Sequence, residues 1–174
     1  MFHPTIFDNL KVALENIIYD LDNLDSQVLV TGREDILNMA DMSRSISIMF
    51  EPVPAEGISA EVCLQASLKD LAAELLETPG EEPGCHLTLR FYIQICEEKQ
   101  TCSAIEKLLY DIWNLHLPPV QILSHHFGDA PGIVNNKIEI AFPQQINENN
   151  MSDLPDMVEH MLITIKKLAP FSKA

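Results

Sequence analysis

The chain is poor in positive charge and contains no long apolar run. Its 11 Lys and Arg residues are outnumbered by 26 Asp and Glu residues, so its formal net charge is -15. Nucleic acids and anionic lipids are bound mainly through cationic side chains, so we expect neither among its partners. No run of about 18 apolar residues occurs, and charged residues interrupt the apolar segment nearest the N-terminus. We therefore expect no membrane segment, no signal peptide and a cytoplasmic location.

Short motifs that mark common catalytic and cofactor sites are also missing. The absence of GxGxxG, GxxxxGK[ST] and GxSxG segments disfavours dinucleotide-binding, P-loop and α/β-hydrolase proteins. There is no CxxC pair and no HExxH segment, and the four cysteines lack the spacing of zinc ligands. We expect free thiols, no cofactor and no metal. No residue is assigned a catalytic role from a motif.

The composition is that of one folded domain spanning residues 1–174. Hydrophobic residues make up 47% of the chain and charged residues 21%, with only six glycines, which is typical of a globular protein. A chain of this length falls within the usual size of a single domain.

Hydrophobic periodicity predicts four helices and six strands. Apolar residues recur every three or four positions in the helical segments and every second position in the strands. Potential capping residues are Thr5 with Asp8, Ser67, and Ser103 with Glu106. The predicted helices are 5–24, 67–77, 103–116 and 152–168; the predicted strands are 28–31, 45–51, 58–64, 87–95, 120–127 and 134–142.

The order αβββαβαββα predicts an α+β fold with a mainly antiparallel sheet and helices packed on one face. The strand 87–95 has the clearest alternation, so we expect it to be long and central. Residues 32–42 are compatible either with a helical turn or with the second arm of a hairpin.

One polar cluster suggests chemistry. His125, His126 and Asp129 carry groups used in metal-dependent hydrolysis and general-base catalysis. Adjacent side chains of a strand point to opposite faces, which argues against joint chelation by the two histidines unless a turn intervenes. A metal-dependent hydrolase using these three residues is the alternative interpretation.

Several apolar side chains are expected on the sheet face opposite the core. Met49 and Tyr92 occupy outward positions of predicted strands, and we place Leu123 and Phe127 on the same face. Apolar groups on a face that no helix covers are typical of an interface, and the alternative is that a helix covers this face as well. These four residues are therefore the predicted partner-binding site.

The segment 87–168 resembles the small acidic secretion chaperones and their YbjN-like relatives. The likeness rests on acidity and on the order strand 87–95, helix 103–116, hairpin 120–142 and final helix; the helix 67–77 departs from the family plan. The resemblance implies non-catalytic dimers that bind extended client segments through apolar patches. It suggests a chaperone-like or adaptor module that forms a homodimer and binds partner proteins.

Overall fold

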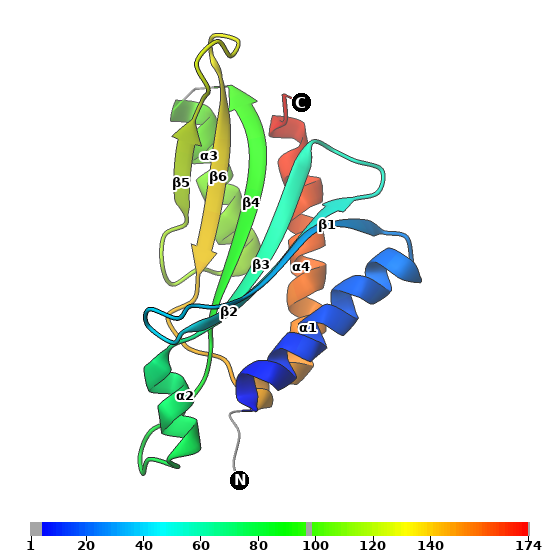
Figure 1. The fold of residues 1–174 in the computed structure, drawn as a ribbon. Coiled ribbons are helices and arrows are strands. Elements are labelled where there is room, and N and C mark those ends of the chain that lie inside the picture. Colours follow the sequence, from blue (N-terminus) through cyan, green and yellow to red (C-terminus); the bar gives the residue numbers. More distant parts are fainter. Residues whose placement is uncertain (1–4, 97–98, 174) are drawn as a thin grey trace.

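The computed structural model describes residues 5–96 and 99–173, which contain the predicted order of helices and strands (Figure 1). The α+β class is confirmed. The helices are α1 (Ile6–Asn23), α2 (Leu68–Leu75), α3 (Lys99–Trp113) and α4 (Leu154–Leu168), with short 3-10 turns at Glu148–Asp153 and Ala169–Phe171. The strands are β1 (Val28–Leu37), β2 (Arg44–Pro52), β3 (Ile58–Ala66), β4 (His86–Cys96), β5 (Val120–Ser124) and β6 (Ile133–Ala141).

The strands form one antiparallel sheet in the order β1-β2-β3-β4-β6-β5. The predicted central strand is confirmed as β4, which has 11 residues and pairs with β3 and β6. β1 and β5 are the two edge strands, each hydrogen-bonded to one neighbour.

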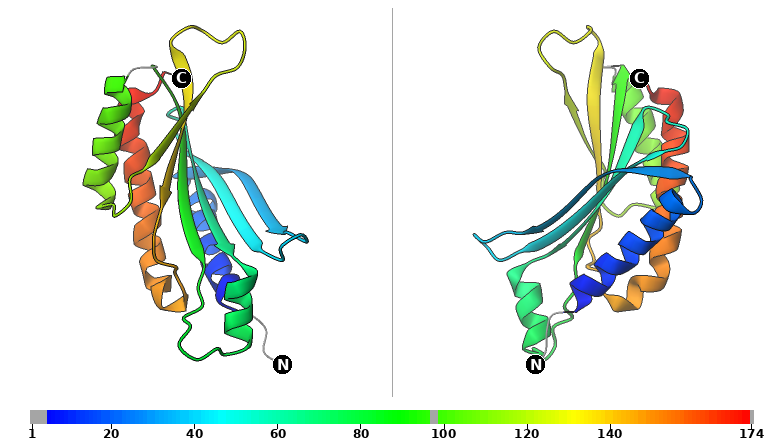
Figure 2. Two further views of the ribbon diagram at one scale, coloured as in Figure 1. Left: turned by 90° about the vertical axis from the view of Figure 1, so that its left-hand side faces the viewer. Right: turned by 45° about the vertical axis from the view of Figure 1, so that its right-hand side comes forward.

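Helices α1, α3 and α4 pack on one face of the twisted sheet, while the opposite face carries no helix in the described part of the chain (Figure 2). Helix α2 lies at one end of the sheet. Alternation along the strands directs apolar side chains toward the three helices, where they join the apolar stripes of α1, α3 and α4 in one core. Its largest fully buried members include Phe7, Leu10, Leu14, Phe50, Leu89, Phe91 and Ile105.

The N-terminus of α1 is capped from a distant helix. Instead of the predicted box of Thr5 and Asp8, the Glu74 carboxylate of α2 accepts the backbone N–H groups of Thr5 at 2.5 Å and Ile6 at 3.1 Å. A carboxylate at this position satisfies two orphan donors and interacts favourably with the helix dipole. The predicted cap at Ser67 is confirmed, because its hydroxyl accepts the Asp70 N–H.

The predicted cap at Ser103 is wrong. Helix α3 already includes Lys99, so Ser103 lies inside the helix and the Ser103/Glu106 pair is not an N-terminal box. The partly buried Cys102 side chain packs against the core, which continues the apolar face of α3 before Ser103. Tertiary packing therefore overrides the local capping signal.

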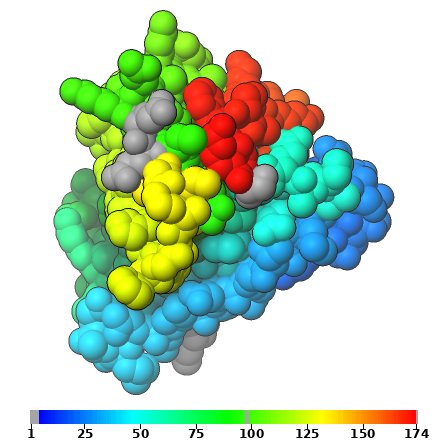
Figure 3. Space-filling model, turned by 90° about the horizontal axis from the view of Figure 1, so that it is seen from above, coloured from blue at the N-terminus to red at the C-terminus, as the bar shows by residue number. Residues whose placement is uncertain are grey.

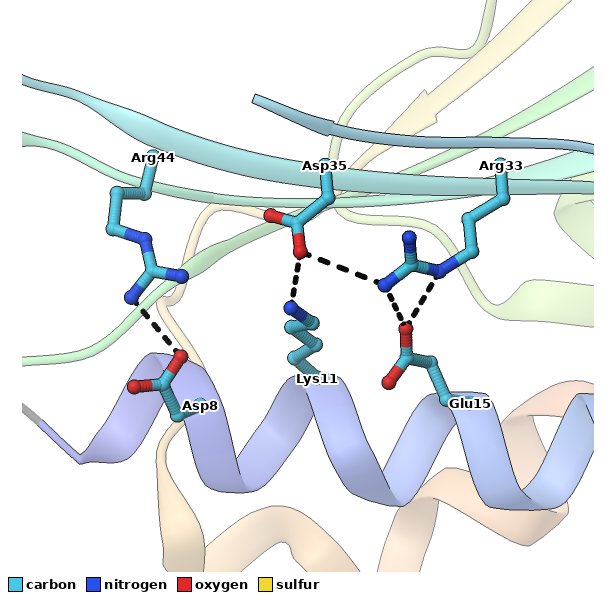
Figure 4. Close-up of polar contacts among 6 residues, drawn as sticks. All are labelled: Asp8, Lys11, Glu15, Arg33, Asp35 and Arg44. Carbon is cyan, nitrogen blue, oxygen red and sulfur yellow. Dashed lines mark hydrogen bonds and ion pairs between the residues drawn. The ribbon is translucent and has the colours of Figure 1, made fainter. Parts of the chain in front are cut away.

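The ambiguous segment after residue 31 is the second half of β1, which pairs with β2 as the arm of a hairpin. Its side chains toward the helices are charged. Arg33 donates to Glu15 of α1 at 2.5 and 2.7 Å, and Asp35 pairs with Lys11 (Figure 4). The second half of β1 therefore contacts α1 through ion pairs and lacks the alternation of apolar and polar residues by which a strand is recognised in a sequence.

Candidate functional site

The helix-free face carries a row of side chains that crosses the sheet. The strand pairing places Met49, Glu61, Arg90, Glu139 and Val120 directly opposite one another on successive strands from β2 to β5. Opposing residues in antiparallel strands lie close enough for direct side-chain contact. The row therefore has an apolar residue at each end and charged groups in the middle.

The charged centre of the row is an ion-pair network. Arg90 donates from Nε to Glu139 at 2.9 Å and from Nη1 to Glu61 at 3.3 Å. Tyr92, one row away, donates its hydroxyl to the same Glu61 oxygen at 2.6 Å. Lys137 Nζ lies 3.9 Å from Glu139. Glu61 is only 8% exposed, so the network holds a carboxylate that is largely removed from water.

The network shifts the titration of its members. Burial opposes the charged form of Arg90, but the hydrogen bond that Arg90 donates to Glu139 and the charge of Glu61 outweigh it and raise the Arg90 pKa. Burial also raises the pKa of Tyr92, and the hydrogen bond to Glu61 adds to this effect. Burial likewise raises the pKa of Cys63, which neighbours the row on β3. These groups keep their neutral-pH charge states and are not poised for proton transfer.

The raised Tyr92 pKa predicts a specific loss of stability at alkaline pH. A tyrosine in the unfolded chain has a pKa of about 10, and the folded state holds the Tyr92 proton more tightly. The stabilisation is fully present below the unfolded value and disappears as the pH rises toward the folded value. We expect the free energy of unfolding to fall more steeply above about pH 10 in the wild type than in Tyr92→Phe. Urea unfolding across this pH range measures the difference, and identical slopes would contradict it.

Beside the network the face is hollowed. A depression of about 560 Å³ has Tyr92, Gln94, Asn135 and Lys137 among its lining residues, with the 51–59 segment on one side. Seen from above, the β5–β6 end (yellow) and the β2–β3 end (cyan) flank this part of the molecule (Figure 3). The depression is open rather than enclosed and is lined by both polar and apolar atoms.

Among the described residues, the charged side chains of this face that have no ion-pair partner are negative. Arg90 and Lys137 are engaged by Glu61 and Glu139. By contrast, Glu34 on β1, opposite Ser47, and Glu51 at the rim of the depression have no ion pair with any described residue. A ligand approaching the face meets unpaired carboxylates.

The structure places two of the four predicted partner-binding residues on this face. Met49 and Tyr92 belong to adjacent rows of it, as expected. The placement of Leu123 there is wrong, because it pairs with the buried Asn136 and faces the helix side. Phe127 is fully exposed, but it lies in the β5–β6 connection and not on a strand.

Two apolar residues of the face were missed. Val120 and Ile122 pair with Glu139 and Lys137, so they share the face with Met49 and Tyr92. The core-side position between them is taken by Gln121, which accepts from Asn136 at 2.8 Å and donates to the Cys102 carbonyl at 2.8 Å. The sequence signal at Gln121 points the wrong way, because a polar residue between apolar neighbours normally faces away from the core. Its hydrogen bonds to Asn136 and Cys102 hold it on the helix side instead, and a local pattern does not show such partners.

The histidine cluster lies in the exposed connection after β5. The Asp129 carboxylate accepts the backbone N–H of His126 at 2.7 Å and lies 3.6 Å from its Nδ1, while His125 is exposed. This is the geometry of a turn closed by an aspartate. Within 5–96 and 99–173, no group of three or more His, Cys, Asp or Glu side chains is arranged to hold a metal ion. The four cysteines are free, and burial raises the pKa of the Cys85 thiol to about 12.

Comparison of the chain with protein-family models, with curated protein sequences and with solved structures finds no match. None of the described helices combines the length and hydropathy that a membrane-spanning segment requires.

Proposed function

We propose that the helix-free face of the sheet binds an extended, cation-bearing segment of a partner protein, as an interaction module of the adaptor or chaperone-like type. The observation that carries the proposal is the distribution of charge on this face. Its cations are held by Glu61 and Glu139, while Glu34 and Glu51 are unpaired among the described residues. Complementary charge favours a basic partner over an acidic one.

The apolar side chains of the face supply the contact area. Met49 and Tyr92 are half-buried, and Ile122 is 49% exposed at the edge of the same face. Covering such groups stabilises a complex by roughly 25 cal/mol per Å² of apolar area, before ordering costs. An extended segment presents side chains alternately to its two sides, so one side can carry both apolar and cationic groups onto these rows.

The chemistry of the site favours binding over catalysis. Arg90 and Tyr92 hold their protons tightly, and the carboxylates that contact them, Glu61 and Glu139, are paired. General acid–base catalysis instead requires a group whose pKa lies near the working pH. The role proposed for this face is accordingly recognition.

The proposal is tested with a dye-labelled peptide of alternating lysine and valine residues, followed by fluorescence anisotropy. The wild-type protein should bind it, and Met49→Asn and Glu51→Gln should each weaken binding by about tenfold, since each removes one type of contact. Binding should also weaken as salt is added, because Glu34 is exposed and Glu51 is partly exposed, so mobile ions screen both carboxylates.

Two controls make the test specific. Met39→Asn changes a methionine that is 74% exposed in the β1–β2 connection, and it should leave binding unchanged. A peptide of alternating glutamate and valine should bind much more weakly than the lysine peptide. Equal binding of the two peptides, or equal effects of the changes at Met39 and Met49, would refute the proposal.

A further inference from the structure

The two edge strands of the sheet, β1 and β5, differ in the features that prevent an edge from pairing with another chain. An edge strand exposes unpaired backbone N–H and C=O groups and can pair with another chain unless something prevents it. Two common devices that prevent it are charged side chains and bulges. An edge strand that lacks these features is therefore available for pairing.

The β1 edge is protected. The pairing with β2 is interrupted by a bulge between Val30 and Gly32, and the Asp22 carboxylate accepts the Val30 N–H at 2.8 Å. Three consecutive charged residues, 33–35, follow along the strand. A second strand would have to displace the carboxylate and approach these charges.

The β5 edge lacks these devices. Its pairing with β6 runs without a shift over Val120–Ser124, and the strand contains no charged residue. The whole segment 112–128 contains no Asp, Glu, Lys or Arg, although the chain as a whole has a net charge of -15. The exposed fractions of Val120, Ile122 and Leu123 are 50%, 49% and 39%, so apolar groups are exposed on both sides of this strand.

We propose that β5 pairs in antiparallel fashion with β5 of a second copy of this chain, about a twofold axis near Ile122. A second copy is the occupant that the charge distribution favours. Two acidic molecules repel each other least when their uncharged segments meet, and a basic partner finds no carboxylate within this strand. An antiparallel strand is self-complementary about a twofold axis, as a closed dimer requires.

The resulting contacts follow from the alternation of the strand. With Ile122 on the axis, it lies opposite the partner's Ile122 on the helix-free face, and Val120 lies opposite the partner's Ser124. Leu123 lies opposite the partner's Gln121 on the helix side. The two sheets become continuous, so their helix-free faces adjoin. This inference is independent of the proposed binding of a basic segment.

The experiment is a mass measurement by light scattering on the full chain, with charges placed on each edge. The wild type should have twice the monomer mass of 19.6 kDa, and Ile122→Glu should have the monomer mass, because two carboxylates would face each other across the axis. The matched control is Ile36→Glu, which changes an isoleucine 46% exposed on the β1 edge and should leave the dimer intact. Circular dichroism should be the same for all three proteins.

A mixture tests the position of the axis. Ile122→Lys alone should also be monomeric, but mixing it with Ile122→Glu should restore the dimer mass, since opposite charges then meet. A monomeric wild type, a dimeric Ile122→Glu protein, or a mixture that stays monomeric would overturn the inference. Peptide binding is judged by its loss in Met49→Asn and Glu51→Gln, which lie on β2 and leave β5 unchanged. The mass measurement and the peptide titration can therefore fail separately, so failure of one proposal is distinguishable from failure of the other.

Discussion

Replacing Arg90 with methionine should lower the free energy of unfolding by about 3–5 kcal/mol. The guanidinium is the cation that links Glu61 and Glu139 across three strands, at 3.3 and 2.9 Å. Without it, the largely buried Glu61 carboxylate loses its charged partner and faces a second carboxylate from β6. The measurement is urea unfolding followed by the fluorescence of Trp113, whose indole N–H donates to Thr164 between α3 and α4 at 2.9 Å.

The control for this variant removes the whole network. Replacing Arg90, Glu61 and Glu139 together with apolar residues of similar size should recover most of the lost stability, because no buried charge remains unpaired. If the single change Arg90→Met cost less than about 0.5 kcal/mol, as ordinary surface substitutions do, the ion-pair network would not be structural.

Replacing Phe91 with alanine should have an effect of similar size, about 3–5 kcal/mol, because the ring is completely buried between the sheet and the helices. On the opposite face of the sheet, Met49→Ala should cost about 1 kcal/mol or less, since Met49 is only half-buried and its strand pairing places it on the face that no described helix covers. Both values come from the same urea titration. Equal losses for the two variants would mean that the helix-free face is packed interior and not a surface open to a partner.

Periodicity was sufficient to predict most of the fold. The strand β4 was predicted because five apolar residues alternate with polar ones, and the helices because their apolar residues follow a period near 3.6. Turn residues between alternating segments correctly predicted the hairpins β2–β3 and β5–β6.

The errors occurred where local patterns were ambiguous or partners came from afar. In β5, both sides of the strand include apolar residues and both are exposed, so alternation could not orient Leu123 and Ile122. The Glu74 cap joins residues 69 positions apart, which no local capping rule detects. The second half of β1 was ambiguous because its core-side residues are charged and pair with α1.

The charged row of the candidate site was only partly accessible to sequence reasoning. Glu61, Arg90 and Glu139 all occupy outward positions of predicted strands. Charged residues at such positions are usually solvated, so their presence does not by itself indicate a functional site. Their mutual contact depends on the pairing register of β3, β4 and β6, which the pattern of a single strand does not specify. That Glu51 has no ion-pair partner among the described residues, while Arg90 and Lys137 are paired with other carboxylates, follows from the structure and not from the sequence.

Methyl NMR during titration with the lysine–valine peptide tests the central claim most directly. If the helix-free face binds the peptide, the methyl signals of Met49 and Ile122 should shift together, while those of Met39, in the β1–β2 connection, and Ile163, on α4, should not move. Shifts confined to Ile163 and other helix-side methyl groups, with Met49 unchanged, would show that the partner surface lies elsewhere.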